Sequence, residues 1–401
     1  MATAATPASG ATRLSWLDSI KGISILWIAF FHFFGAYEND RFPSALGPQY
    51  VSSFLQQCAP TSSLETAGCL AKASYVAVAS VGFHAVAVFL ILSGFGLTYS
   101  LAKTGNPEGG WWSWYRGRLL RLFPMYWVAH VVCLISPFVA LPEPIDYRFV
   151  LSLLGDRVWP VSTIFYYINP AWWYFGLLVE LYLVFPLLFR LLQKLGPTKF
   201  LLVCGAATIL SRYLLLFVLS AHGYYVQGAF FGARLWEFAA GMVLGWVYRH
   251  HQEAAQERLF TGSTFFAGVA LYVAGLYSYG PALAYLLTDA LIGTGLFIIL
   301  AHLSVWTNLV PRLSTMLAHV GAFSYGLYLL HQPYVIYFGE LWRGQTMLIV
   351  SLLGCMLIAV LTACAIPFER YVNQLTNRIL DRKKTDTSLA PASHKQAAAG
   401  R

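Results

Sequence analysis

The sequence has few charged residues. Only 11% of its 401 residues are Asp, Glu, Lys or Arg, and 58% are hydrophobic, whereas a soluble domain carries roughly a quarter charged residues. This composition excludes an ordinary soluble enzyme and predicts an all-α, polytopic membrane protein built as a single helical bundle. The net charge of +9 is typical of short cytoplasmic loops that collect Lys and Arg, so we expect no nucleic-acid partner, whereas membrane lipids are expected around the bundle.

Cysteine is also scarce, since six residues are too few for a disulfide scaffold. Cys58 and Cys69 share one polar loop, where an oxidising compartment would permit a disulfide; the sequence leaves open whether they pair. The other four lie in apolar segments, where cysteine packs as a small hydrophobe: Cys133, Cys204, Cys355 and Cys364.

Common catalytic motifs are missing. The sequence has no HExxH and no CxxC, so we expect no metal site. It also has no Walker loop and no GxGxxG, and a Ser-His-Asp triad cannot be assembled from it.

Ten segments are long and apolar enough to cross a membrane as helices. They lie near residues 15–36, 78–101, 119–141, 170–192, 199–221, 227–249, 261–279, 281–304, 315–338 and 344–368. The stretch 145–168 is interrupted by Asp156, Arg157 and Pro160, which favours an outer loop or a re-entrant piece.

The flanking charges predict an orientation. Lys and Arg concentrate in the even-numbered connections and in the tail, which places both termini in the cytoplasm of a multi-pass protein of the cell membrane. We divide the chain into a flexible lead (1–12), a membrane domain (13–375) and a basic cytoplasmic tail (376–401), whose last stretch, TDTSLAPASHKQAAAGR, has the composition of a disordered segment.

Two ionisable residues stand in the first apolar segment, SIKGISILWIAFFHFFG. Such residues are costly in a membrane helix and need a reason. Eleven steps of ~100° leave Lys21 and His32 within about 20° of one face and roughly 16 Å apart. This arrangement suits a substrate that enters from one side and reacts partway across. The alternatives are a lysine that extends to the membrane surface and a hydrogen-bonded core histidine.

The segment SYGLYLLHQP also places polar residues on one face of a helix. Ser324, Tyr328 and His331 follow i, i+4, i+7 spacing and therefore share one face. A stripe of hydroxyls that ends in histidine suits a wet cavity, although hydrogen bonding between helices would also explain it.

Arginines enter the third span from the cytoplasmic side, in WWSWYRGRLLRLFPMYW. Arg118 and Arg121 are three apart and share a face, with Arg116 close by. They either contact lipid headgroups or, together with Lys21, hold a polyphosphate such as the pyrophosphate of coenzyme A.

Other ionisable residues lie within apolar segments. Arg234 and Glu237 are three apart and either form an ion pair that joins helices or act on substrate, Arg234 by orienting an acceptor and Glu237 by orienting a histidine. Glu180 and Arg212 either pair with each other or line the cavity. For these two, and for Asp289 and His84, a structural role is the favoured interpretation. Glu369, at the inner end of the last span, could meet a cytoplasmic cation.

These positions together resemble the acyltransferase 3 family of integral membrane acyltransferases. The resemblance runs in order from about residue 13 to 375 through LDSIKGISILWIAFFH, FLILSGFGLTYS, RGRLLRLFPMYW, NPAWWYFGLLVELYLVFPLL, ARLWEFAAG, GAFSYGLYLLHQP and IPFERY.

The resemblance implies a ten-helix enzyme that carries an acyl group, acetyl above all, from cytoplasmic acyl-CoA to a hydroxyl of an extracytoplasmic or lipid-linked saccharide. His32 falls on the family's catalytic histidine and Lys21 on its cationic partner. The matched motifs also bring Ser93 and Tyr126 into the expected donor site, together with Arg116, Arg118 and Arg121; Tyr328, His331 and Glu237 complete the expected catalytic set.

Three departures weaken the transfer of roles. Lys21 replaces an arginine, Ala87 replaces an acidic residue, and Glu180 is offset from the usual position. A second class of protein, a transporter or flippase with a polar intramembrane path, would also use buried His, Glu and Arg. The acceptor, the acyl length, the oligomeric state and the choice between an acyl-histidine and direct transfer remain open at this point.

Overall fold

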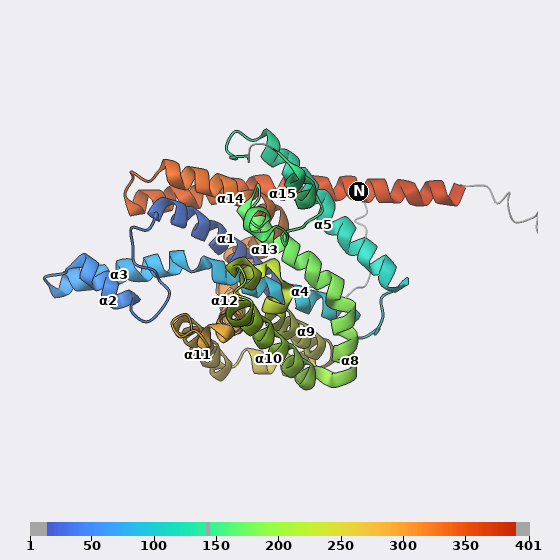
Figure 1. Cartoon of the computed structure of the whole chain (residues 1–401), viewed down its shortest axis with the longest axis horizontal. Helices are drawn as coiled ribbons and strands as arrows, with labels where there is room; N and C mark the ends of the chain where they lie inside the picture. The colour runs from blue at the N-terminus through green and yellow to red at the C-terminus, as the bar shows by residue number, and fades with distance from the viewer. Residues whose placement is uncertain (1–13, 142–144, 390–401) are drawn as a thin grey trace, which may run out of the picture.

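The computed structural model describes residues 14–141 and 145–389, with side chains described to residue 379. Within these ranges all regular structure is helical, as the composition predicts. Helices α14 and α15 lie along one side of the molecule, and α2 and α3 project from the end opposite to the C-terminal part of α15 (Figure 1). The long α-helices are α1 (Ser15–Glu38), α3 (Ser63–Ser80), α4 (Ala85–Leu101), α5 (Gly110–Ile135), α8 (Trp173–Tyr213), α9 (Leu235–His250), α11 (Gly262–Tyr277), α12 (Thr288–Trp306), α13 (Pro311–Ala322), α14 (Ser324–Leu341) and α15 (Met347–Leu389).

Short elements connect these helices. They are α2 (Tyr50–Cys58), η1 (Gly82–His84), α6 (Tyr147–Leu153), α7 (Val161–Ile164), η2 (Pro170–Trp172), η3 (Leu214–Val218), η4 (Tyr225–Ala229), η5 (Phe231–Arg234), α10 (Gln252–Leu259), η6 (Ala284–Leu287) and η7 (Thr307–Leu309). The interrupted stretch 145–168 thus forms two short helices, α6 and α7, in a connection between α5 and α8.

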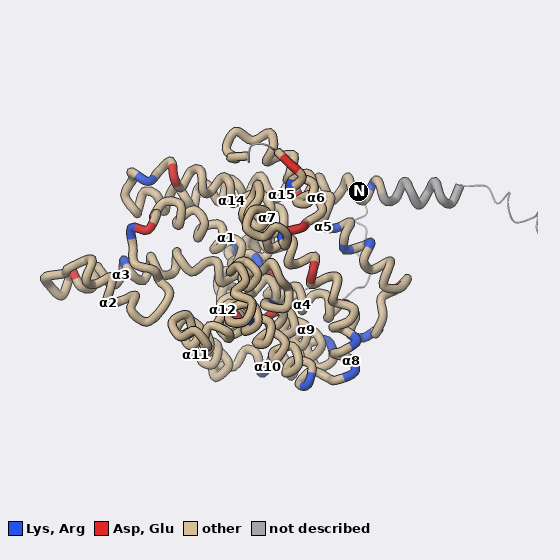
Figure 2. Tube along the Cα trace, viewed as in Figure 1, with Lys and Arg blue, Asp and Glu red and all other residues tan. Residues whose placement is uncertain are grey.

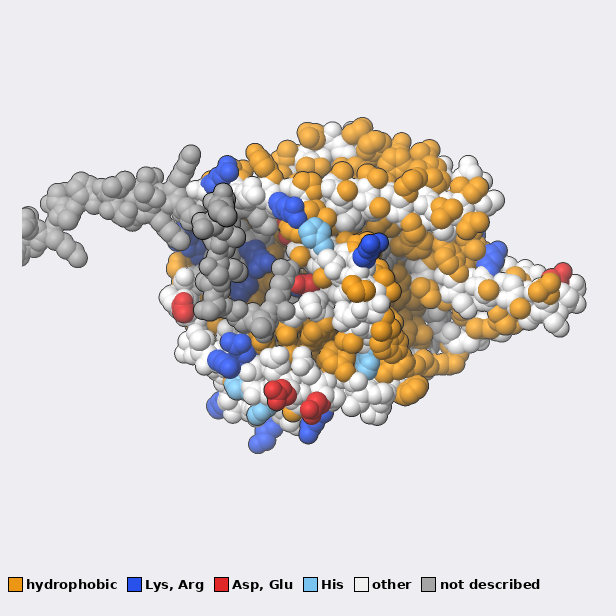
Figure 3. Space-filling view, turned by 180° about the vertical axis from the view of Figure 1, so that it is seen from behind, with side chains coloured by type: hydrophobic (Ala, Val, Ile, Leu, Met, Phe, Trp, Pro, Cys, Tyr) orange, Lys and Arg blue, Asp and Glu red, His pale blue; other side chains and the backbone are white. Residues whose placement is uncertain are grey.

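Six helical stretches of the described chain are long and apolar enough to span a membrane, or up to eight if two bent helix pairs are counted as spans. Length and composition alone therefore identify fewer than the ten expected membrane spans. Hydrophobic side chains cover much of the face in Figure 3, which suits a chain surrounded by lipid.

Several boundaries differ from those expected. The third span was expected over 119–141, but α5 begins earlier, where Trp114 stacks on Phe185 of α8 with ring centroids 5.1 Å apart. It ends at Ile135 because Pro137 favours an extended conformation at Ser136. The helix α15 extends to Leu389, within the expected basic tail 376–401. The lead 1–12 and residues 390–401 lie outside the described residues.

Close packing of helix backbones depends on glycine at two contacts. Gly22 of α1 lies against the backbone of Leu317, and Gly321 of α13 lies against the backbone of Asp18, so neither position has room for a side chain. Between α4 and α9, Gly241 and Gly245 lie in the same way against the backbone of α4. Small residues four apart are a common means of joining membrane helices.

The expected single helix over 315–338 is wrong, because α13 and α14 meet at a bend of 82°. The first N–H groups of a helix lack partners within the helix. In α14, the Gly326 N–H donates to Glu369 Oε2 of α15 at 2.7 Å, and a carboxylate is favourable at a helix N-terminus. Glu369 therefore supports a new helix start that the local sequence does not reveal.

A proline in α14 ties this helix to η2. Pro333 has no N–H, so the carbonyl of Leu329 loses its usual partner in the helix. This carbonyl instead accepts hydrogen bonds from Trp172 Nε1 and Asn169 Nδ2, both at 3.0 Å. The contact fixes α14 against the start of α8, where the cavity described next is formed.

Candidate active site

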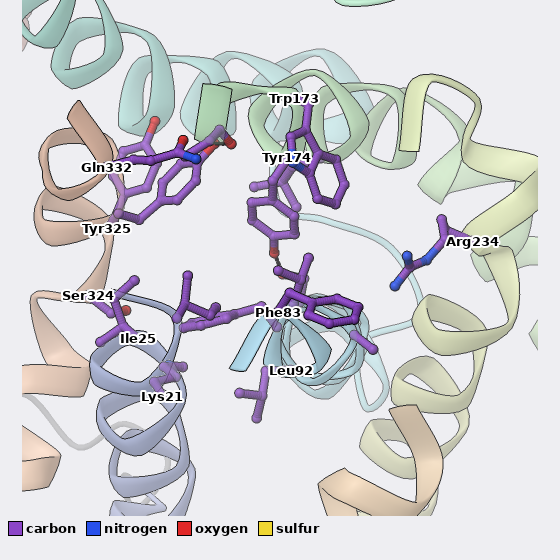
Figure 4. Close-up of a pocket in the computed structure, with 18 of the residues that line it drawn as sticks. Lys21, Ile25, Phe83, Leu92, Trp173, Tyr174, Arg234, Ser324, Tyr325 and Gln332 are labelled. Carbon is purple, nitrogen blue, oxygen red and sulfur yellow. Dashed lines mark hydrogen bonds between the residues drawn. The ribbon is translucent and has the colours of Figure 1, made fainter. Parts of the chain in front are cut away.

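A cavity of about 1260 Å³ lies inside the helical bundle. Side chains from α1, α4, α5, α8, α12, α14 and α15 line it. In Figure 4, Lys21, Ile25 and Ser324 lie on one side of the cavity, Trp173 and Tyr174 on a second, and Arg234 opposite Lys21. One continuous space therefore reaches residues from many separate segments of the chain.

The prediction that Lys21 and His32 share a face of α1 is confirmed, since both line this cavity. Lys21 Nζ lies 3.2 Å from Asp18 Oδ1, and the lysine side chain keeps 36% of its surface exposed. The pair with Asp18 holds the ammonium group at the cavity wall, and its remaining donors are available to a ligand.

His32 meets a second histidine. The ring centroids of His32 and His331 are 5.5 Å apart. Gln332, the residue after His331, donates from Nε2 to His32 Nδ1 at 3.2 Å. Sequence reasoning singled out both histidines but missed Gln332, although it lies only 100° from His331 around α14.

The three polar residues expected on one face of α14, Ser324, Tyr328 and His331, all line the cavity. The hydroxyl of Tyr328 is already engaged, because it donates to the Ala171 carbonyl and accepts from the Phe175 N–H, both at 3.0 Å. Tyr328 therefore fastens α14 to the start of α8, and its hydroxyl is not free to act on a substrate in this arrangement.

The arginines of α5 separate into two groups. Arg118 and Arg121 line the cavity, as does Lys21, whereas Arg116 is exposed and does not. The guanidinium of Arg118 lies 5.6 Å from the centre of the Trp114 ring. Two of the three expected phosphate-binding arginines thus face the same space as Lys21.

Of the two further residues expected at the donor site, Ser93 lines the cavity and its hydroxyl lies 3.4 Å from that of Tyr174. Tyr126 does not line it. Its buried hydroxyl donates to the Ser152 carbonyl at 2.9 Å and accepts from Arg157 at 2.7 Å. Tyr126 belongs to the packing between α5 and α6, because Arg157 and Ser152, far along the chain, supply its partners.

Four charged residues, three of them buried and Asp289 partly exposed, form a network beside the cavity. Arg234 Nε donates to Glu237 Oε1 at 2.6 Å, and Arg234 Nη1 lies 3.4 Å from Asp289 Oδ1. Asp289 also pairs with the fully buried Arg212. The cavity touches Arg234 and Asp289 but not Glu237, so Glu237 holds an arginine and not a histidine.

The remaining ionisable residues have other partners than expected. Glu180 and Arg212 neither pair with each other nor line the cavity, because Glu180 Oε2 accepts from the Phe231 N–H at 2.8 Å and Arg212 pairs with Asp289. His84 lines the cavity and is hydrogen-bonded to the hydroxyls of Tyr272 and Tyr279, at 3.0 and 3.1 Å. Asp289 and His84 were assigned to structure alone, and the cavity shows that both also face a possible ligand.

The cysteines and metal ligands complete the comparison with the sequence. Cys58 and Cys69 form a disulfide between α2 and α3. Cys133 and Cys204 are buried as expected, whereas Cys355 and Cys364 are exposed on α15. In residues 14–141 and 145–379, three or more His, Cys, Asp or Glu side chains do not come together as a metal site would require.

Comparison with known proteins gives the family. Residues 14–366 match the family described as the acyltransferase domain of acyltransferase 3 type. The chain is 26% identical over 302 residues to the acyltransferase MdmB of Streptomyces mycarofaciens, an alignment that covers 67% of this chain and 72% of that protein. No solved structure matches. With its helical bundle, its central cavity and a match over most of its length, this chain belongs to the acyltransferase 3 family of membrane-embedded acyl-transferring enzymes.

Proposed function

We propose that this protein is a membrane O-acyltransferase that carries an acyl group, acetyl in the first place, from cytoplasmic acyl-CoA to a hydroxyl of an extracytoplasmic or lipid-linked saccharide. One observation carries the proposal: a single cavity joins three cations, Lys21, Arg118 and Arg121, to the pair His32 and His331. Cations suit the phosphates of a donor, and an imidazole suits the proton transfer that an acyl acceptor needs.

The donor is assigned to the cationic part of the cavity. Arg118 and Arg121 carry planar guanidinium groups that bind phosphate oxygens in pairs, and Lys21 adds a mobile point charge. These groups would hold the pyrophosphate of coenzyme A, while the thioester extends along the apolar wall toward His32.

The chemistry is assigned to His32. Imidazole changes its charge near neutral pH and is therefore a suitable general base. The acceptor hydroxyl gives its proton to His32 as its oxygen bonds to the thioester carbonyl carbon; the carbon–sulfur bond then breaks, and the departing thiolate takes up the proton. Holding both substrates in one cavity supplies much of the rate.

The acceptor is assigned to the part of the cavity around Trp173, Tyr224 and Tyr279, next to the pair Arg234–Asp289. Flat aromatic faces suit the apolar faces of sugar rings, and the charged pair suits their hydroxyls. This combination supports a saccharide.

We also propose ten membrane crossings with both termini in the cytoplasm. Gly196 has a non-helical backbone that breaks α8 into two segments. Ten crossings result when the two segments of α8 are counted together with α9, the two bent helix pairs and the other five long apolar stretches. Lys and Arg gather around the start of α5, around α10 and in the middle of α8, whereas the α2–α3 end carries both signs (Figure 2), and a Lys/Arg excess favours the cytoplasmic side.

The test uses the full-length protein in lipid nanodiscs with radiolabelled acetyl-CoA. We expect coenzyme A to raise the melting temperature, and label to move to a saccharide acceptor in the wild type. In His32→Ala we expect the same stabilisation by coenzyme A but transfer reduced by at least 10²-fold. A transporter or flippase would neither be stabilised by coenzyme A nor cleave its thioester, and that result would overturn the proposal.

A further inference from the structure

The hydrogen bonds of His331 define its neutral form. Its Nδ1 lies 3.1 Å from the Leu327 carbonyl and 3.0 Å from the Tyr328 carbonyl. Carbonyl oxygens only accept, so Nδ1 must carry the proton. Nε2 of His331 is therefore the unprotonated nitrogen, and it is buried without a partner.

His32 is held differently, by an amide that can act in two ways. Gln332 presents its Nε2 to His32 Nδ1 at 3.2 Å, which makes Nδ1 an acceptor and leaves the proton of the neutral ring on the Nε2 of His32. In this form the Nε2 of His32 cannot take a proton from a substrate. The base-competent form needs the proton on Nδ1, and thus an acceptor in place of the amide nitrogen.

Gln332 carries that acceptor on the same side chain. It is 6% exposed, and its Oε1 is buried without a partner. A buried polar atom without a hydrogen bond is destabilising. A half-turn of the amide would place Oε1 against Nδ1–H of His32 and give Oε1 a hydrogen-bond partner.

From this geometry we propose that Gln332 is a positioning residue that selects the proton-accepting tautomer of His32 by turning its amide. The inference rests on the proposed function, since it deepens the assignment of His32 as the base. Before reaction, Gln332 Oε1 accepts from His32 Nδ1–H, and the Nε2 of His32 is unprotonated.

With His32 in this tautomer, every proton in the reaction is accounted for. The hydroxyl proton moves to His32 Nε2 as the new carbon–oxygen bond forms. Nδ1–H stays bound to Gln332 Oε1, which stabilises the imidazolium. The same proton leaves from Nε2 to the thiolate when the carbon–sulfur bond breaks, and the neutral tautomer returns.

The surroundings of His32 hold few other ionisable groups. On the elements that pack against α1, the ionisable side chains lining the cavity are Tyr325, Tyr328 and His331 of α14, His84 of η1, Asp289 of α12 and Glu369 of α15; α3, α4 and α13 contribute none to the lining. Of these groups, His331 is the one in ring contact with His32. A pH effect that depends on residue 332 therefore reports on this histidine pair.

Two variants in the full-length protein test the proposal. Gln332→Leu removes both halves of the amide, and we expect kcat to fall roughly 10- to 100-fold while KM for acetyl-CoA stays within about twofold. The acid limb of the kcat/KM profile should move to lower pH, because the imidazolium loses its acceptor. In Gln332→Glu a carboxylate accepts from Nδ1–H, and the acid limb should move to higher pH by about one unit or more.

Gln193→Leu is the control, because it removes a comparable side-chain amide hydrogen bond outside the cavity. In the wild type, Gln193 Nε2 donates to the Gly105 carbonyl at 3.1 Å. We expect the pH profile of kcat/KM to be unshifted in Gln193→Leu.

Unshifted pH profiles in both Gln332 variants would overturn the inference, whatever happens to kcat. The proposed function fails separately, if His32→Ala keeps transfer. In the His32→Ala background, Gln332→Leu should add no further loss, and an additional loss would contradict a role through His32.

Discussion

At the scale of residues, three arginines on one helix differ in where their side chains lie. Arg118 and Arg121 line the cavity, and Arg116 points away from it. All three were expected at the donor site from sequence, because spacing alone shows which residues share a face and not which face meets the cavity.

We expect Arg118→Ala and Arg121→Ala to weaken binding of acetyl-CoA, because each removes a charge-assisted contact to phosphate worth about 1.5–3 kcal/mol. This corresponds to a loss of roughly one to two decades in affinity. Arg116→Ala is the matched control on the same helix and should change affinity less than about twofold. Calorimetric titration with coenzyme A gives the comparison. Equal losses in the three variants would point to general surface charge and not to a phosphate site.

A second residue-scale prediction concerns Asp289, which pairs with both Arg212 and Arg234. Asp289→Ala should destabilise the protein by about 3–5 kcal/mol, because it leaves a buried cation without its counter-charge. Arg234 still keeps Glu237, so Arg212 is the residue left uncompensated. Adding Arg212→Met should therefore restore much of the lost stability in thermal unfolding.

The exposed pair Glu340–Arg343 provides the comparison for this network. Glu340→Ala should cost less than about 1 kcal/mol, as is usual for surface ion pairs. If Asp289→Ala costs as little as Glu340→Ala, the buried network does not stabilise the bundle and Asp289 is free for another role.

Residue periodicity predicted which side chains share a helix face. Helical spacing brought together Lys21 with His32, and Ser324 with His331, because it depends only on neighbours in the chain. The family resemblance put Tyr126 at the donor site, and the sequence did not find the partner of Arg212. Both residues are held by Arg157 or Asp289, which come from distant segments. Gln332 was missed although its neighbour His331 was not, because an amide between a histidine and a proline carries no signal of its own.

At the scale of elements, the bend between α13 and α14 shapes the cavity. The apolar run 315–338 predicts one continuous helix. The structure instead starts α14 at Ser324, with Glu369 of α15 accepting from the first turn. The local sequence could not reveal this, because the residue that supports the new helix start lies more than forty positions away. In this arrangement Ser324, Tyr328 and His331 all line the cavity.

This arrangement depends on the contact of α13 with α1, which predicts the effect of a side chain at Gly321. In Gly321→Leu the new side chain would meet the backbone of Asp18 and Gly22, so α13 must move away from α1 and carry the adjoining bend with it. We expect a lower melting temperature and a loss of stabilisation by coenzyme A, because Lys21 lies beside this contact.

Gly35→Ala is the control on α1, since a methyl group there meets no atom within 4 Å. Alanine favours helix over glycine by roughly 0.5–1 kcal/mol, so this variant should be neutral or slightly stabilised in the same thermal assay. Similar destabilisation in both variants would mean that α1 tolerates no substitution at all, and that the contact with α13 is not special.

At the scale of the whole molecule, composition predicted the class correctly and could not predict the number of crossings. The described chain is helical and carries six long apolar stretches, or eight with the bent pairs. Hydropathy detects length and apolar content, but Gly196 in α8 and the bend at Phe323 alter how a stretch is divided. Direct measurement of sidedness therefore decides the proposed topology.

The topology prediction follows from the positions of the cysteines. The disulfide Cys58–Cys69 joins α2 to α3 at the projecting end of the molecule (Figure 1), and Asn377 lies exposed on α15, toward its C-terminal end. With both termini in the cytoplasm, a membrane-impermeant thiol reagent should label Cys58 and Cys69 in intact cells after reduction, in a background where Cys355 and Cys364 are replaced by Ser. Without reduction the label should be absent, because disulfide sulfurs do not react with the reagent.

In a Cys58→Ser, Cys69→Ser chain that carries Asn377→Cys, labelling should appear only after the cells are permeabilised. Labelling of Asn377→Cys in intact cells would place the C-terminus outside, reverse the side from which Arg118 and Arg121 are reached, and so remove cytoplasmic acyl-CoA as their ligand.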